Sequence, residues 1–449
     1  MIARYDGWLA SSSTSTRDEW RGTALSVATF AVAILLVGCD GKGPTQPSDQ
    51  AKNAAVSEFP LRVWVVTDIQ DAEAIRRKWQ GETPQPIEIR ELTIQELLGG
   101  EKCRCDVLIY PSRLSGELVS RGWVLELPSK LTGGDDSVLT GLNKASAYQA
   151  AYNQRNYALP LGCDVAGVFV SDAVARESEA FGGWNQLVED LPAEDMTISD
   201  DAVDRAAIVD RYLAIASSIS SREAKYGLLF DLPDMVGVLN RYGEFEEAAT
   251  MLLRLAQQTP DGRLAVGSHV SAWETVSQSD AALATVLPLA VLPSDLAGDA
   301  GEFYANVIST DTGSLWNTGH GLNVSLAEDC SQTAQAIGLV RWLAEPQTRT
   351  FLGSQMQGIT PASPGGTSAA RWKAIQSQQP LLTERVAHEL RLPLADQYRS
   401  ILADELTTML KGQSTPKQMV NRVAAGWSKI NRQNPEQGRR YQESLGLRY

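Results

Sequence analysis

Histidine and cysteine are scarce in this sequence. The 449 residues include three histidines and five cysteines, and no two cysteines form a CxxC pair. Ligand spacing therefore predicts neither a zinc site nor an iron–sulfur site. The sequence also lacks HExxH, GxSxG, a Walker lysine loop and a GxGxxG that follows a strand. These motifs mark several large enzyme classes, so we expect no enzyme, no metal and no cofactor.

Positive charge is also in short supply. Lysine and arginine number 40 against 54 aspartates and glutamates, which gives a net charge of −14. No basic stripe is available to neutralise phosphates, so nucleic acid is an unsuitable partner. Adjacent carboxylates occur at Asp200–Asp201 and Glu246–Glu247. Neighbours in sequence point to different faces, so we interpret both pairs as solvated surface and not as catalytic pairs.

The N-terminal region contains one long apolar stretch. Residues 22–38 are uncharged and follow Arg17 and Arg21, as in an export signal. The stretch ends in LVGC at residues 36–39, which resembles a bacterial lipobox. The resemblance implies cleavage before Cys39, lipidation of that cysteine and attachment to the membrane by its acyl chains. The alternative is an uncleaved anchor helix. The following Asp40 resembles a signal for retention on the periplasmic side of the inner membrane.

A polar segment follows the lipobox. Residues 39–58 are rich in Gly, Pro, Ser and Gln and too poor in apolar residues to pack, which predicts a flexible tether. Removal of residues 1–38 leaves 411 residues. That length exceeds what one core usually holds and predicts two lobes.

The other four cysteines are Cys103, Cys105, Cys163 and Cys330. In an oxidising compartment one or two disulfides are possible among them, and the sequence does not choose a pairing. The alternative is that some of them are buried free thiols.

The body of the chain begins with alternating strands and helices. Apolar β-rich runs predict strands at 61–67, 87–92 and 106–110, and helical spacing predicts helices at 71–80 and 113–120. This order predicts a mostly parallel sheet. Ligands of such sheets bind beyond the carboxyl ends of the strands, which here are Thr67–Asp68 and Tyr110–Ser112.

An ordered series of weak motifs runs from about residue 59 to residue 430. They are DVLIYPSRLSGELVSRGWVLELP (106–128), YALPLGCDVAGVFV (157–170), WNQL (184–187), GHGLNVS (319–325), VRWLAEP (340–346) and GITPASP (358–364). In order and spacing the series resembles the extracellular solute-binding proteins of ABC importers, of the sugar type. The resemblance implies a periplasmic-binding-protein-like type II fold, in which two α/β lobes hinge about a central ligand cleft. The implied lobes are 59–163 with 288–355, and 164–287 with 356–449.

The resemblance implies a monomeric receptor that captures a small solute, most naturally a sugar, and delivers it to ABC permease subunits. A sugar needs a flat aromatic face and short polar side chains. The candidates at strand ends and crossovers are Thr67, Asp68, Tyr110, Ser112, Asp164, Trp273, Trp316 and His320. For Tyr110 and Trp316 the alternative is core packing, for Asp164 a turn cap and for His320 loop structure. The alternative functions are an exported enzyme that acts on carbohydrate and the ligand-binding component of a sensor.

The C-terminal region is predicted to be helical. Leu402, Leu406 and Leu410 recur at helical spacing, and Thr415–Pro416 starts a further helix by its N-cap and N1 preferences. That helix carries an apolar stripe of Met419, Val423, Trp427 and Ile430, which we interpret as core. Residues 431–449 are polar, and we expect them to be loosely held.

Overall fold

The computed structural model describes residues 58–66, 72–135, 137–177, 184–220, 243–291, 302–304, 314–367, 369–378, 382 and 386–445. The apolar stretch 22–38, Cys39, tether residues 40–57 and the candidates Thr67 and Asp68 lie outside these ranges. Within them, no helix combines the length and the apolar character that a bilayer crossing requires. The described residues belong to one compact unit.

The first sheet has five strands in the order β2-β1-β3-β11-β6. Strands β1, β2 and β3 run parallel, and β11 runs antiparallel to its neighbours β3 and β6. The strands are β1 (Leu61–Val66), β2 (Ile87–Leu92), β3 (Val107–Pro111), β6 (Leu159–Pro160) and β11 (Leu322–Leu326). The predicted strands and their parallel arrangement are therefore confirmed.

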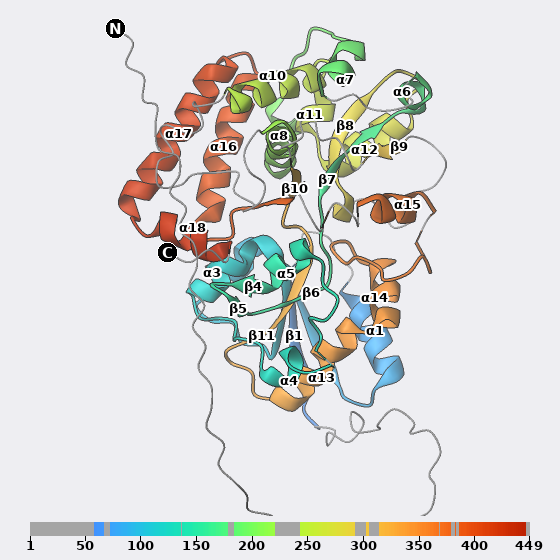
Figure 1. Cartoon of the computed structure of the whole chain (residues 1–449), viewed down its shortest axis with the longest axis vertical. Helices are drawn as coiled ribbons and strands as arrows, with labels where there is room; N and C mark the ends of the chain where they lie inside the picture. The colour runs from blue at the N-terminus through green and yellow to red at the C-terminus, as the bar shows by residue number, and fades with distance from the viewer. Residues whose placement is uncertain are drawn as a thin grey trace, which may run out of the picture. The chain divides into compact units, whose positions relative to one another are not determined.

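Helices cover both faces of this sheet (Figure 1). Val107 and Ile109 of β3 share a core with Trp79 of α1, whereas the alternating Leu108 and Tyr110 belong to a second core with Leu118 of α3. The helices of this part are α1 (Glu73–Glu82), α2 (Ile94–Gly99), α3 (Ser115–Ser120), α4 (Ser129–Thr132), α5 (Lys144–Ala150), α13 (Thr333–Ala344) and α14 (Pro346–Gly353). A 3₁₀ turn, η2 (Ser112–Leu114), joins β3 to α3, and a small hairpin consists of β4 (Ala151–Tyr152) and β5 (Arg155–Asn156).

The second sheet has three strands in the order β8-β7-β9, and both pairings are antiparallel. Its strands are β7 (Ala166–Val170), β8 (Ala284–Pro288) and β9 (Glu302–Tyr304). A separate parallel pair consists of β10 (Leu315–Asn317) and β12 (Val386–His388). Trp316 of β10 packs in the same core as β7 and β8, although the sequence-based division assigned 288–355 to the first lobe.

We call the five-stranded sheet with its helices the first part, and the elements that pack with the three-stranded sheet the second part. Helix α8 (Arg205–Ile219) lies in the core of the second part. Every residue from Ala207 to Ile219 is buried, including the charged pair Asp210 and Arg211. Arg211 donates to the carbonyls of Ala265 (2.8 Å) and Gly267 (2.6 Å), at the end of α11. Other elements here are α6 (Asp172–Glu177), α7 (Trp184–Asp190), η3 (Asp200–Ala202), α10 (Glu244–Ala256), α11 (Arg263–Val266), α12 (His269–Ser277), η6 (Leu289–Val291) and α15 (Ala369–Gln378).

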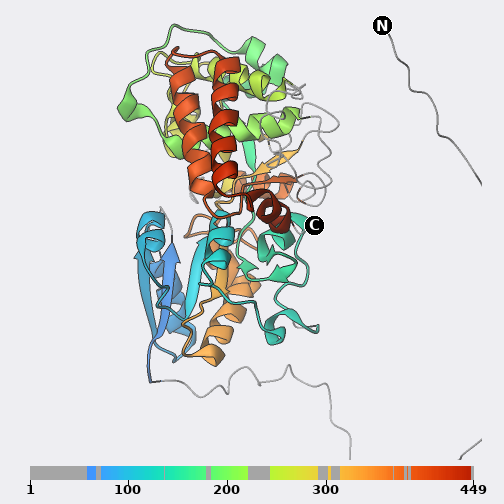
Figure 2. The same cartoon turned by 90° about the vertical axis from the view of Figure 1, so that its left-hand side faces the viewer.

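Two long helices, α16 (Ala395–Leu410) and α17 (Pro416–Gln433), lie side by side against the second part (Figure 2). The predicted start of α17 is confirmed, because Thr415 and Gln418 form a capping box ahead of the helix. All four residues of the predicted apolar stripe are buried in the core that contains α8. The Trp427 indole also donates to the Tyr398 carbonyl at 2.9 Å.

The expectation that residues 431–449 are loosely held is wrong for their described part. Helix α18 (Gln437–Ser444) buries Gln437, Tyr441 and Ser444. The backbone N–H of Asn153, in the first part, donates to the Glu443 carbonyl at 3.0 Å. Tyr441 and Leu445 also pack in the core that contains α8, and two apolar residues in a polar segment gave too weak a pattern to predict this. A buried guanidinium, Arg391, donates to the carbonyls of Tyr148, Ala151 and Ser444.

Candidate functional site

Three crossing segments, 161–165, 318–321 and 358–361, connect the first sheet or its covering helix α14 with elements of the second part. They touch one another through their backbones. A Cβ on Gly162 would lie 2.3 Å from the Gly358 carbonyl oxygen, and a Cβ on Gly321 would lie 2.3 Å from the Gly162 carbonyl oxygen. No side chain fits at such a distance, so glycine is required where these segments meet.

Asp164 lies within the first crossing segment and is 2% exposed. Its carboxylate accepts hydrogen bonds from the Ala290 backbone N–H (2.9 Å) and the Thr318 hydroxyl (2.7 Å). Burial raises the pKa of Asp164. A cavity of about 20 Å³ lies beside it, between Cys163, Gly321, Thr360 and Arg371, among other residues. That volume suits about one water molecule, so a sugar fits here only if the crossing segments move apart.

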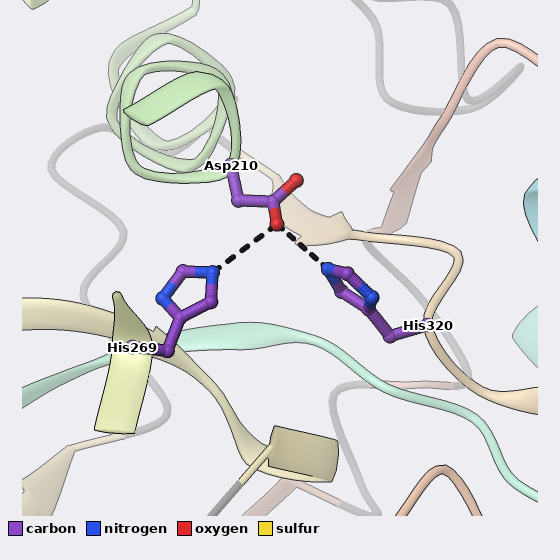
Figure 3. Close-up of side chains that lie close together, drawn as sticks. All are labelled: Asp210, His269 and His320. Atoms are coloured by element: carbon purple, nitrogen blue, oxygen red, sulfur yellow. Dashed lines mark hydrogen bonds and ion pairs between the residues drawn. The ribbon is translucent and has the colours of Figure 1, made fainter. Parts of the chain in front are cut away.

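A second polar cluster centres on Asp210 of α8, whose carboxylate is fully buried. Figure 3 shows this carboxylate between two imidazoles. Its Oδ2 lies 2.7 Å from Nε2 of His320 and 3.2 Å from Nε2 of His269, and its Oδ1 lies 2.8 Å from Nη2 of Arg399. Arg399 also pairs with the buried Glu389. We call these five residues, together with Arg113, the Asp210 cluster.

The hydrogen bonds assign the proton on His320. Nη1 of Arg113 lies 2.8 Å from its Nδ1, and a guanidinium only donates. Nδ1 therefore accepts and carries no proton, while Nε2–H donates to Asp210. The imidazole is neutral in this arrangement. A proton added at Nδ1 would place two donors against each other and break the contact with Arg113.

His269 is neutral for a different reason. Burial outweighs the nearby Asp210 and lowers the pKa of His269 to about 4. Burial alone would raise the pKa of Asp210, but Arg399 and the two imidazoles more than offset it and hold that pKa well below its usual range. The carboxylate is thus the charged centre of the cluster, and the surrounding donors satisfy it.

Asp210, His269 and His320 offer three ligand atoms within 4.8 Å of one another, which is the donor set of a divalent metal. Their surroundings do not fit a metal. Arg399 occupies the second oxygen of Asp210, and Arg113 donates to the outer nitrogen of His320. An added dication would lie next to two guanidiniums, whereas metal-bound histidines usually donate that outer N–H to an acceptor. We therefore interpret the cluster as a hydrogen-bonded junction.

The junction joins the two parts of the molecule. Arg113 follows β3 of the first sheet and His320 lies in a crossing segment, while Asp210, His269 and Arg399 belong to helices of the second part. A pocket of about 180 Å³ lies beside it. Its lining residues are Leu98, Arg113, Leu114, Glu117, Arg121, Leu390, Leu392, Leu394, Ala395, Asp396, Gln397 and Arg399. This pocket is therefore bounded by α2, η2 and α3 on one side and by the start of α16 on the other.

The structure brings some of the predicted site residues together. Ser112, Asp164 and His320 lie on or beside the crossing segments. The Ser112 hydroxyl is buried and has no hydrogen-bond partner among the described residues, while its backbone N–H donates to the Gly321 carbonyl at 2.9 Å. The Thr318 hydroxyl links the other two residues. It donates to the Asp164 carboxylate and accepts from the backbone N–H of His320.

The predicted aromatic residues lie elsewhere. Tyr110 is fully buried in the first sheet's core, where its hydroxyl lies 2.9 Å from that of Ser325. Trp316 is 1% exposed in the core of the second part. Both placements match the packing alternative. Trp273 is partly buried on α12, where it packs against the small core that contains Phe169 and Leu287.

Sequence reasoning missed Asp210, His269 and Arg399. A usable signal existed for Asp210, because the helical run AAIVDRYLAIA is apolar apart from Asp210, Arg211 and the Tyr212 hydroxyl, and a buried aspartate must be paired. The identity of its partners was not readable, since His269 is 59 residues away and His320 is 110 residues away.

No family model matches the chain, and a search of curated proteins finds no match. Solved structures do match. An ABC-transporter solute-binding protein from Agrobacterium radiobacter, in complex with ribitol, has a TM-score of 0.61 at 12% identity, over 84% of this chain and 99% of the other. The chain has the fold of the ABC-transporter solute-binding proteins. The predicted fold class, periplasmic-binding-protein-like α/β, is thereby confirmed.

Two further solute-binding proteins show the same likeness. Maltose-bound MalE3 of T. maritima has a TM-score of 0.58 at 15% identity, over 83% of this chain and 99% of the other. The cyclic alpha-maltosyl-1,6-maltose binding protein of Arthrobacter globiformis has a TM-score of 0.55 at 12% identity, over 84% of this chain and all of the other. The solute-binding-protein fold thus spans nearly the whole of each matched chain.

Proposed function

We propose that this chain is a solute receptor that captures a sugar or polyol between two lobes and delivers it to an ABC importer. The observation that carries the proposal is the fold, together with the buried polar groups that it gathers where the crossing segments meet. The matched structures of this fold include one with ribitol and one with maltose. We expect the chain to bind its solute without chemical conversion.

The lobes are best drawn from the packing. The first lobe contains the five-stranded sheet and the second contains the three-stranded sheet with α8, α16 and α17. Because Trp316 packs with the second sheet and β11 pairs with β3, we place the return to the first lobe at 318–321. The hinge is then formed by the three crossing segments.

The solute would lie against Ser112, Asp164 and His320. Asp164 offers acceptor oxygens to hydroxyl groups, and His320 can exchange its bond to Asp210 for a bond to a solute. The small volume beside Asp164 means that entry requires the lobes to separate first. A solute that contacts both lobes then stabilises their closed arrangement by its additional contacts.

The remaining parts of the proposal concern location. We propose that Cys39 carries the lipid, that the tether 39–58 holds the receptor at the periplasmic side of the inner membrane, and that the permease subunits receive the solute there. A monomer suffices for this role, because one chain supplies both lobes.

A ligand screen tests the proposal. The purified chain is heated with sugars, polyols, amines and oxyanions in turn, and we expect a sugar or polyol to raise the melting temperature. Calorimetry then gives its Kd, and chromatography of the recovered solute checks that it is unchanged. A response to oxyanions or amines alone, or a converted sugar, would refute the proposed function.

A pair of buried aspartates provides the matched variants. Asp164→Asn removes a charged acceptor at the crossing segments and is expected to weaken the Kd at least tenfold, since a hydrogen bond to a charged group contributes about 1.5–3 kcal/mol. Asp106 is equally buried but lies before β3, where it pairs with Arg62 at 3.0 Å. Asp106→Asn is expected to leave the Kd unchanged. Equal loss in both variants would argue against a site at Asp164.

A further inference from the structure

Two of the cysteines lie in the short loop between α2 and β3. Cys103 is 3% exposed and Cys105 is fully buried, in a core with Leu97 and Leu108. Their Sγ atoms are 3.2 Å apart. A disulfide bond is about 2.05 Å long, so the two sulfurs are only about 1.2 Å beyond bonding distance.

The remaining described cysteines are placed differently. Cys163 lies in a crossing segment and contacts Asn317, whereas Cys330 lies in the turn after β11. Within the described ranges, Cys103 and Cys105 are the one pair whose sulfur atoms are in contact. The sequence allowed three complete pairings of these four residues, and the geometry singles out one pair.

We propose that Cys103 and Cys105 are a redox-active pair that closes to an intramolecular disulfide. The proposal does not depend on the solute-receptor function, because it rests on the loop alone. The oxidant is a disulfide, either of a small thiol or of a protein, as found in compartments that support disulfide formation.

The reaction consists of two exchanges. The thiolate of one cysteine attacks the oxidant's S–S bond, forming a mixed disulfide and releasing one thiol of the oxidant. The thiolate of the other cysteine then attacks the protein sulfur of the mixed disulfide and releases the second thiol. Together the two cysteines lose two electrons and two protons, and the two released thiols receive all of them.

The loop is suited to the opening that this exchange requires. Lys102 and Arg104 are exposed on either side of Cys103. The backbone N–H of Gly100 bonds to Leu97, and that of Asp106 bonds to Arg62. In the described structure, no backbone N–H between Gly100 and Asp106 donates to another backbone carbonyl. Few backbone hydrogen bonds must therefore break before a thiol meets an oxidant.

Peptide mapping of the full chain tests the proposal. The reduced protein is exposed to oxidised glutathione, in buffer and in dilute urea that loosens the loop, then alkylated and digested with trypsin. Cleavage after Lys102, Arg104 and Arg113 separates the two cysteines. We expect the dipeptide 103–104 to appear linked to peptide 105–113, or the uncleaved ring in peptide 103–113, and dithiothreitol to reverse the link.

Variants provide the controls. Cys103→Ser is expected to abolish the link and leave Cys105 open to alkylation, whereas Cys330→Ser is expected to retain it. The wild-type map decides the question even if Cys103→Ser does not fold. Full alkylation of both cysteines after oxidation in urea, a persistent glutathione adduct, or a link from either residue to a different cysteine would each overturn the proposal.

Discussion

Mild acid should destabilise this protein through two buried histidines. Burial lowers the pKa of His269 to about 4 and that of His388 to about 3, against an ordinary value of about 6.5. Between those values and 6.5 the unfolded chain binds protons that the folded chain does not. Stability is therefore full above pH 6.5 and falls as the pH is lowered toward 4.

The size of the effect follows from the pKa differences. A shift of about 2.5 units for His269 corresponds to about 3 kcal/mol in all, of which about 2 kcal/mol is already lost at pH 5. His388 contributes a similar loss at pH 5. We expect the free energy of unfolding to fall by about 4 kcal/mol between pH 7.5 and pH 5 from these two groups.

One substitution isolates the contribution of His269. In His269→Gln the side-chain amide nitrogen takes the place of Nε2 and still donates to Asp210, but it does not titrate. Urea denaturation followed by tryptophan fluorescence at pH 7.5 and pH 5 gives the free energy of unfolding of both proteins. We expect the variant to lose about 2 kcal/mol less than the wild type.

The comparison cancels the other acidic groups, since Asp164 and Glu389 are present in both proteins. His388→Gln provides a parallel test at a histidine outside the Asp210 cluster, which packs on the Tyr148 ring at 4.8 Å. If His269→Gln lost as much stability as the wild type on going to pH 5, a neutral His269 beside Asp210 would be excluded.

Three further outcomes are expected in urea denaturation at pH 7.5. Gly321→Ala should cost at least about 2 kcal/mol, because its Cβ would meet the Gly162 carbonyl. Its control is Gly338→Ala, in an open position on α13, which should be neutral or stabilising by about 0.5–1 kcal/mol. Equal effects of the two substitutions would contradict the close approach at Gly321. Asp210→Asn leaves Arg399 short of one buried counter-charge and should cost about 3–5 kcal/mol, so a loss below about 1 kcal/mol would refute its central role. Thr415→Ala should cost about 1 kcal/mol through loss of the capping box, and an unchanged stability would show that the cap contributes nothing.

Local features of the fold were readable from the sequence because neighbouring residues determine them. The apolar run 61–67 and the alternation of 87–92 predict parallel strands, and Thr415–Pro416 predicts the start of α17; all are confirmed. The apolar stripe with Trp427 is buried as predicted. Each of these features depends on spacing within a few residues.

Features that depend on distant contacts were not readable. The antiparallel pairing of β7 with β8 joins residues more than a hundred positions apart, and the short strand β10 gave no sign that Trp316 packs with them. The site suffered in the same way. His320 was a candidate, but Asp210 reaches it only because α8 passes the crossing segment in the folded chain.

The buried Arg391 gives the last described turns of the chain an unexpected importance. Its guanidinium donates to carbonyls of the adjacent elements α5 and β4 and to one of α18, and burial lowers its pKa to about 10. Shortening the chain after Asn434 would remove the Ser444 carbonyl and leave a cation in an apolar setting with fewer acceptors. Trimming this polar end for crystallisation or expression is therefore expected to harm folding, and an affinity tag is better placed ahead of the first strand.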